Sequence, residues 1–178
     1  MAKSRHLILT LFCLTFFSFS YSQSNTDTVK INYTDTNSIY LSNSICCFPE
    51  INIQITPPQY FSKLPNNAIG FIHNPTASSI QIAEIKNTAY FMVIKGLDSA
   101  YFRSQNLDFL NRKDVVTNDG KKGVLYLVKF KVEGVEFERI MIFTGDYNRT
   151  IWLNANFPAM GHETLYEVLL SSLLTIKF

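Results

Sequence analysis

The sequence predicts an α+β domain in which strands pack against helices, and two stretches of the chain indicate it. Residues 107–158 alternate apolar and polar side chains between tight-turn signals, the pattern of an antiparallel meander of up to four strands. The last segment, "GHETLYEVLLSSLLTIKF", follows Pro158 and carries apolar residues at helical spacing. A sheet with an apolar face and a helix with an apolar stripe bury these surfaces against each other.

The elements that precede the meander are shorter and of both kinds. "INIQIT" (51–56) and "SSIQIAEI" (78–85) alternate isoleucine with other residues, which predicts half-buried strands. Between them, "AIGFI" (68–72) is a short apolar stretch bounded by turn residues. The apolar run at 90–94 has an ambiguous pattern, and the helical spacing after it predicts a helix from about Asp98 to Asn106.

Two turns and one irregularity define the meander. "NDGKKG" (118–123) and the pair Glu133-Gly134 supply residues that tolerate the positive φ angles of tight turns. In "VEFERIMIF" (135–143) the alternation slips near Arg139, because the apolar residues before and after it are in opposite phase. Either a bulge re-aims this strand, or both of its faces are covered.

The final helix has a well-defined buried stripe. Its members recur at i, i+4, i+7, i+8 and i+11, and they are Leu165, Leu169, Ser172, Leu173 and Ile176. Each fully buried Leu or Ile contributes about 1.5 to 3 kcal/mol. The sequence therefore predicts that this C-terminal helix packs on the sheet.

The chain divides into three predicted segments. Residues 1–22 carry two basic residues, then an apolar run, then small residues, which indicates a secretory signal peptide cleaved near Ser22. The apolar run is too short for a typical membrane span, and a lipid anchor on Cys13 is a minor alternative because bulky Phe12 precedes it. Residues 23–45 are mostly small and polar and predict a flexible tether, and 46–178 form the folded domain.

Charge argues against nucleic acid as a partner. The signal peptide holds two of the 16 Lys and Arg residues and none of the 14 Asp and Glu residues, so its removal leaves a formally neutral chain. Binding to phosphates requires a clustered excess of basic side chains. The nearest such group fits solvated strand faces and a turn, and it consists of Arg112, Lys113, Lys121, Lys122, Lys129 and Lys131.

Motifs for catalysis, cofactors and metals are absent from the sequence. "HETLY" at 162 lacks the second histidine that a zinc helix motif needs, and Tyr166 stands there instead. No G-x-S-x-G elbow occurs, and "DGKKG" lacks the spacing of a phosphate-binding loop. His162 therefore fits a helix start and His73 a turn, and we expect no cofactor, no metal site and no enzyme activity.

The adjacent cysteines Cys46 and Cys47 leave three alternatives open. They are a structural or incidental pair at the domain edge, a vicinal or intermolecular disulfide, or a metal or redox pair. A catalytic hypothesis needs His73 within hydrogen-bond reach of one sulfur, in a small thiol-dependent or hydrolytic enzyme outside the cytoplasm.

A partner surface is predicted around the last strand of the meander. Its candidate residues are Tyr147, Arg149, Trp152, Asn154 and Asn156, of which the last three alternate away from Ile151, Leu153 and Ala155. The competing interpretation is that Trp152 packs beneath a helix, as it would in a sheet covered on both faces.

The order of these features resembles the PsbP-like superfamily. The resemblance starts at "INIQITPPQYF", continues through "GFIHNPTASSIQIAEI" and the stretch from "NRKDVV" to "NANFP", and ends with the last helix. It implies an α/β/α sandwich with a central antiparallel sheet, and a binding or assembly factor without enzyme activity. We therefore expect an exported bacterial accessory protein, periplasmic, extracellular or envelope-associated, with an unknown protein or small-molecule partner.

Overall fold

The fold is taken from a computed structural model, which describes residues 40–178. The predicted signal peptide (1–22) and residues 23–39 of the predicted tether lie outside the described residues. The described end of the tether contacts the domain, because Leu41 forms a bridge with Pro58 and the N–H of Ser42 donates to the carbonyl oxygen of Pro57 at 2.9 Å.

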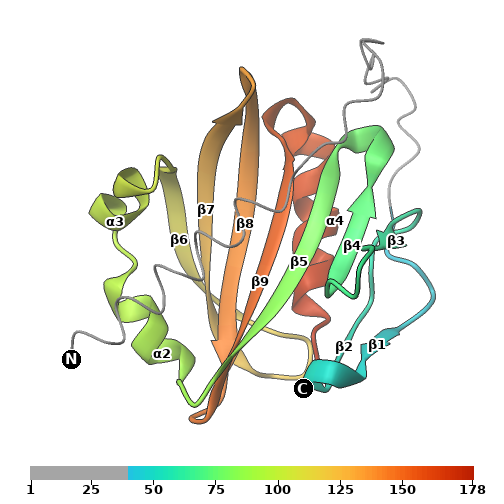
Figure 1. The fold of residues 1–178 in the computed structure, drawn as a ribbon, viewed down its shortest axis with the longest axis vertical. Helices are drawn as coiled ribbons and strands as arrows, with labels where there is room; N and C mark the ends of the chain where they lie inside the picture. Colours follow the sequence, from blue (N-terminus) through green and yellow to red (C-terminus); the bar gives the residue numbers. More distant parts are fainter. Residues whose placement is uncertain (1–39) are drawn as a thin grey trace. The chain divides into compact units, whose positions relative to one another are not determined.

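A seven-stranded antiparallel sheet forms the centre of the domain (Figure 1). Its spatial order is β3-β4-β5-β9-β8-β7-β6, so the last strand, β9, returns to the middle beside β5. The strands are β3 (Ser62–Lys63), β4 (Gly70–His73), β5 (Ser78–Lys86), β6 (Asp108–Val116), β7 (Lys122–Val132), β8 (Val135–Gly145) and β9 (Arg149–Pro158). The predicted four-stranded meander is β6 to β9, and the predicted strand at 78–85 is β5.

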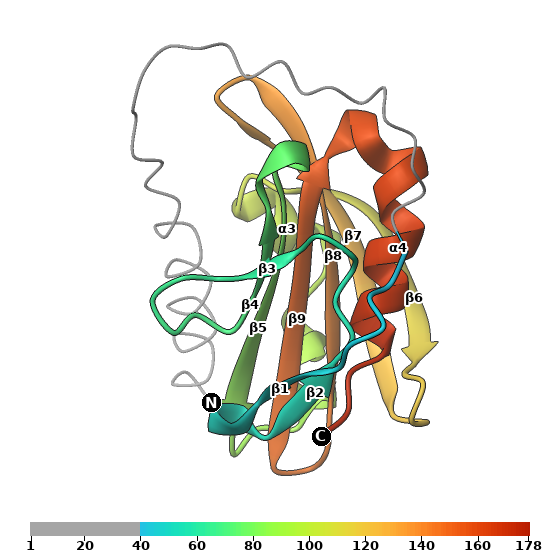
Figure 2. The ribbon, with the colours of Figure 1, turned by 90° about the vertical axis from the view of Figure 1, so that its right-hand side faces the viewer.

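Helices cover both faces of this sheet. Figures 1 and 2 show α4 on one face, called the α4 face here, and α2 and α3 on the other, called the α2/α3 face. The helices are α2 (Tyr90–Val93), α3 (Ser99–Ser104) and α4 (His162–Leu174), with 3-10 turns η1 (Pro49–Ile51), η2 (Asn74–Thr76), η3 (Ile94–Gly96) and η4 (Ala159–Gly161). The predicted α/β/α sandwich with a C-terminal helix on the sheet is confirmed.

Turn and capping residues define the ends of several elements. Glu133 and Gly134 have φ angles of 50° and 84°, the left-handed conformations that a two-residue turn between twisted strands requires. Asp98 caps α3, because its carboxylate accepts the N–H of Tyr101 at 2.7 Å. The ambiguous run at 90–94 becomes the single turn of α2, which continues into η3.

The irregularity at Arg139 comes from two-sided burial. The pairing of β8 with β7 and β9 runs without a register shift from Val135 to Gly145, so no bulge lies at this position. Ile140 and Ile142 belong to the core beneath α4, and the alternate residues Arg139, Met141 and Phe143 point to the α2/α3 face. Both faces of β8 are buried, which removes the alternation that a one-sided strand shows.

The stripe of α4 packs on the sheet as predicted. All five predicted residues are buried, and all but Ser172 join a core with Ile80, Ile140 and Leu153. Four of the five lie on α4, whereas Ile176 follows the end of the helix at Leu174. Ser172 is the polar member, and its hydroxyl donates to the carbonyl oxygen of Thr56 at 2.7 Å. This bond satisfies a buried hydroxyl and ties α4 to the segment after β2.

A small second sheet lies beside the C-terminal segment. It pairs β1 (Cys46–Phe48) with β2 (Ile53–Ile55), and Gln54 exchanges two backbone hydrogen bonds of 2.9 Å with Lys177. Phe48 and the two isoleucines of β2 enter the core beneath α4. Among residues 40–178, no helix is long and apolar enough to cross a membrane.

Candidate functional site

The cysteine pair and His73 are held by separate contacts. Cys46 and Cys47 are free thiols on β1, half-buried and exposed respectively. Successive residues of a strand point to opposite faces, which directs the two sulfurs apart. The Nδ1 of His73 lies 2.8 Å from the Thr76 hydroxyl, its ring stacks on Phe61, and burial lowers the pKa of the imidazole.

These contacts do not provide what thiol chemistry needs. No hydrogen bond joins His73 to either sulfur within the described part of the chain, so the dyad of the catalytic hypothesis is not formed. The structure also holds no vicinal disulfide between the two cysteines. Residues 40–178 contain no cluster of three or more His, Cys, Asp or Glu side chains that could hold a metal.

His162 begins α4, as the sequence predicts, and pairs with an acidic residue of the sheet. Its Nδ1 lies 2.6 Å from Oε2 of Glu138, a largely buried carboxylate on β8. The imidazole also stacks on Tyr166, one helical turn further on. The pair therefore joins the start of α4 to β8 across the α4 face.

The five predicted binding residues do not form one surface. Trp152, Asn154 and Asn156 share the α2/α3 face of β9, as their alternation predicts. Arg149 points to the opposite face, and Tyr147 lies in the turn between β8 and β9.

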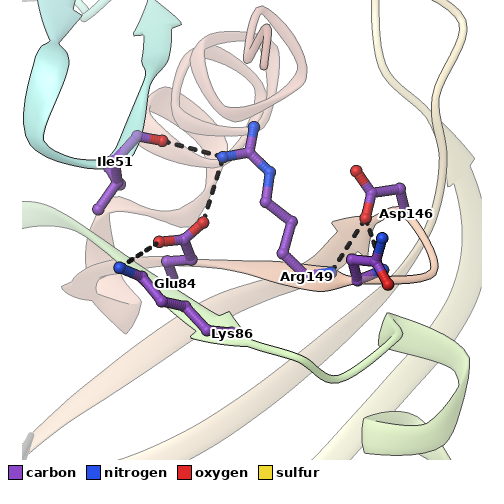
Figure 3. Close-up of polar contacts among 6 residues, drawn as sticks. Ile51, Glu84, Lys86, Asp146 and Arg149 are labelled. Atoms are coloured by element: carbon purple, nitrogen blue, oxygen red, sulfur yellow. Dashed lines mark hydrogen bonds and ion pairs between the residues drawn. The ribbon is translucent and has the colours of Figure 1, made fainter.

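Arg149 is a bracing residue between three segments (Figure 3). Its Nη1 donates to Oε1 of Glu84 on β5 at 3.2 Å and to the carbonyl oxygen of Ile51 at 3.1 Å. The guanidinium also lies over the ring of Phe178, 5.1 Å from its centroid. These contacts connect the central sheet to the β1–β2 hairpin and to the end of the chain, which favours a structural role.

Trp152 belongs to an aromatic core. It is buried, its ring stacks on Phe143 at 5.7 Å, and Phe143 contacts Tyr126, which in turn contacts Phe102 of α3. This is the packing that the competing interpretation of Trp152 expects beneath helices. The sequence could not separate the two interpretations, because an aromatic residue on an alternating strand suits both.

An exposed aromatic patch, defined here as Phe91, Met92 and Tyr147, lies at one end of the sheet. The residues are 40%, 53% and 83% exposed, and the rings of Phe91 and Tyr147 meet edge to face with centroids 6.0 Å apart. Sequence reasoning found Tyr147 but missed the two residues of α2, because the ambiguous run at 90–94 hid a single helical turn. Only the contact of α2 with β8 and β9 brings them to this turn.

A second polar group, called the amide row here, consists of Ser79, Arg139, Asn154 and Asn156 on the α2/α3 face. The Nε of Arg139 donates to Oδ1 of Asn156 at 2.5 Å, and Nδ2 of Asn156 donates to the hydroxyl of Ser79 at 3.3 Å. Burial lowers the pKa of Arg139 to about 10, which leaves the guanidinium protonated at neutral pH. Sequence reasoning missed Arg139, although the slip of alternation there was a signal of its burial.

Asn154 is the least satisfied member of this row. It is 3% exposed, and its Oδ1 is buried and accepts no hydrogen bond from the described residues. A buried acceptor without a donor costs about 1 to 3 kcal/mol, so proteins seldom retain one without a use.

Comparisons with known proteins identify the fold. No family model matches the sequence, and no curated protein matches it. Cyanobacterial PsbP (CyanoP) from Synechocystis sp. PCC 6803 superposes with a TM-score of 0.53 and 9% identity, over 75% of this chain and 91% of that one. LpqN of Mycobacterium tuberculosis gives 0.56 and 10%, over 71% and 82%.

A protein of Bacteroides thetaiotaomicron also matches over 70% of this chain, with 12% identity and a TM-score of 0.47. The chain spans less than half of that protein, 44% of its length. With a seven-stranded antiparallel sheet between helices and the superpositions on CyanoP and LpqN, the chain has the PsbP-like fold.

Proposed function

We propose that this chain is an exported, non-catalytic binding or accessory protein of the cell envelope, and that a partner protein docks on the aromatic patch. The observation that carries the proposal is the exposure of Phe91, Met92 and Tyr147 at one end of the sheet, where the rings of Phe91 and Tyr147 are in contact. One structural neighbour, LpqN, is involved in cell envelope biogenesis in its own organism, which supports an envelope role for this fold.

Exposed apolar groups of this kind suit a protein interface. Aromatic residues and methionine are enriched at the cores of interfaces, where they bury large areas. The rings of Phe91 and Tyr147 meet edge to face and remain partly exposed to water. Their exposed parts contribute no burial free energy until a partner covers them. Association would therefore bury apolar surface that the free chain leaves exposed.

The patch is also held in place before any partner arrives. The hydroxyl of Thr150 donates to the carbonyl oxygen of Thr88 at 2.7 Å, which ties the start of β9 to the loop before α2. In the turn that carries Tyr147, the carboxylate of Asp146 accepts the N–H groups of Asn148 and Arg149 at 2.8 and 3.0 Å. Such preorganisation reduces the conformational entropy that binding would cost.

Capture from envelope extract tests this proposal, with a matched control in the same chain. The purified protein and its Tyr147→Ser and Tyr60→Ser variants are immobilised in equal amounts, and retained proteins are quantified. Tyr60 is a suitable control because it is similarly exposed but lies in the loop between β2 and β3. We expect one or more proteins whose retention falls with Tyr147→Ser and persists with Tyr60→Ser.

Equal retention by all three proteins would show that the patch is not the docking surface. Export is tested separately by the mass of the protein recovered outside the cytoplasm. We expect the residues up to about Ser22 to be missing from it. A full-length mass in that fraction would contradict the predicted signal peptide.

A further inference from the structure

One edge of the central sheet is long and uncovered. β6 is the last strand in the spatial order, and among the described residues it pairs with β7 alone (Figure 1). All of its residues are exposed except Val115, which is half-buried. The strand at the opposite edge, β3, has only two residues. A long edge presents unpaired N–H and C=O groups to which another strand can add.

The register of the sheet decides which backbone groups of β6 face outward. The residues that flank the two-residue turn between β7 and β8 form a hydrogen-bonded pair, so even-numbered residues of β7 bond to β8 and odd-numbered ones to β6. From residue 112 onward, even-numbered residues of β6 lie opposite even-numbered residues of β7. Arg112, Asp114 and Val116 therefore point their N–H and C=O groups away from β7. The N–H of Arg112 accordingly donates to the side-chain oxygen of Asn111, at 2.7 Å.

Two of these outward residues carry opposite charges on the same face. Arg112 and Asp114 have side chains that are 47% and 83% exposed, and Nη2 of the arginine lies 3.7 Å from Oδ1 of the aspartate. The guanidinium lies 6.0 Å from the ring centroid of Tyr126, on the α2/α3 face. Lys113 points to the other face, where its ammonium lies 5.9 Å from the ring centroid of Tyr166 on α4.

We propose that two copies of this chain associate through β6, antiparallel and edge to edge, so that their two sheets become continuous. Hydrogen bonding requires outward residues of one copy to face outward residues of the other. A register in which Arg112 or Asp114 faces its own counterpart opposes like charges. The register with Arg112 opposite Asp114 of the second copy instead forms two opposite-charge pairs, related by the two-fold axis.

This self-association goes beyond the docking of a partner on the aromatic patch and does not depend on it. Its strength is limited by two features of the edge. Lys113 faces Lys113 of the second copy, although each ammonium stays over the Tyr166 ring of its own chain. The N–H of Arg112 must also exchange the Asn111 side chain for a carbonyl oxygen of the second copy. The ladder is short, so we expect a weak dimer with a Kd on the order of 10 to 100 μM.

Sedimentation velocity of the purified protein tests the proposal, over concentrations from about 5 to 500 μM. The native protein should change from monomer to dimer within this range. Arg112→Asp and Asp114→Arg each place like charges opposite each other across the interface, so each should weaken the dimer about tenfold or more. An equimolar mixture of these two variants should dimerise as tightly as the native protein, because every introduced charge then faces its opposite in the other chain.

The mixture also serves as the folding control, since only folded chains can regain the dimer. Lys95→Asp, an equal change of charge at an exposed position of η3, should leave the Kd unchanged. A native protein that stays monomeric over the whole range would overturn the proposal. The same conclusion would follow if both single variants dimerised like the native protein, or if their mixture dimerised no more tightly than either variant alone.

Discussion

The ion pair between Arg149 and Glu84 is expected to brace the domain, and a double-mutant cycle measures how strongly. The pair is 3.2 Å long, and its side chains are only 18% and 10% exposed. Arg149 also donates to the carbonyl oxygen of Ile51, which Glu84 does not contact. The two single variants, Glu84→Gln and Arg149→Met, should therefore differ in their effect on the free energy of unfolding.

The magnitudes follow from burial. Exposed pairs couple by less than about 1 kcal/mol, whereas removing one partner of a buried pair costs about 3 to 5 kcal/mol. For this largely buried pair we expect Arg149→Met to cost about 3 kcal/mol, because it removes two hydrogen bonds and leaves a carboxylate in a dry setting. Glu84→Gln keeps an acceptor and should cost about 1.5 kcal/mol, with a coupling energy of about 1.5 kcal/mol.

Urea unfolding followed by fluorescence is a suitable assay. The chain has a single tryptophan, Trp152, which is buried against Phe143 and will report the loss of the core. Lys86→Met is the control, because Lys86 is exposed and lies 3.9 Å from Glu84. It should change stability by less than about 0.5 kcal/mol.

A coupling energy below about 0.5 kcal/mol would refute this reasoning. It would mean that water screens the pair as it does an exposed one. Equal effects of the two single variants would instead contradict the additional role assigned to the Ile51 carbonyl.

Three further predictions concern stability and use the same unfolding assay. Ser172→Ala should cost about 1 to 2 kcal/mol, because it leaves the partly buried carbonyl oxygen of Thr56 without its donor, while Ser171→Ala on the exposed side of α4 should cost almost nothing. Burial lowers the pKa of His73 below its usual 6.5, so the unfolded chain binds the proton more readily. The free energy of unfolding should therefore fall as the pH decreases below 6.5 and level off below the lowered pKa. It should depend less on pH in a His73→Gln variant, and identical pH profiles of the variant and the native protein would contradict this. Gly70→Ala should cost more than about 3 kcal/mol, since its φ is +151° and a Cβ would overlap a carbonyl oxygen of β5, whereas Gly96→Ala has open space and should stay within about 1 kcal/mol of the native protein.

Most of the fold could be predicted because local patterns and tertiary packing agree. The alternation of β5 and β7, the turn at Glu133-Gly134 and the stripe of α4 each depend on neighbouring residues only. The position of the β1–β2 hairpin could not be predicted, because its anchor is a backbone pairing between Gln54 and Lys177, far apart in sequence. The slip at Arg139 left two alternatives that only the strand register could separate.

The candidate site was less predictable, because side-chain type says little about which partner a residue meets. The alternation of β9 places Asn154 and Asn156 on one face, and the same parity places Arg149 on the other, although the prediction grouped Arg149 with them. Asparagine on a strand usually indicates a solvated face, so the burial of Asn154 and Asn156 had no local signal, whereas the slip of alternation at Arg139 was one. The aromatic patch joins Tyr147 to α2, and that contact depends on the tertiary fold.

Photo-crosslinking from position 147 tests most directly whether the aromatic patch is the docking surface of an accessory protein. Benzoylphenylalanine replaces Tyr147 in one variant and the similarly exposed Tyr60 in another, and both are irradiated in intact cells. The account predicts a discrete crosslinked protein from position 147 that is absent from position 60. Identical crosslinks from both positions, or none from position 147 in cells that contain the folded protein, would contradict it.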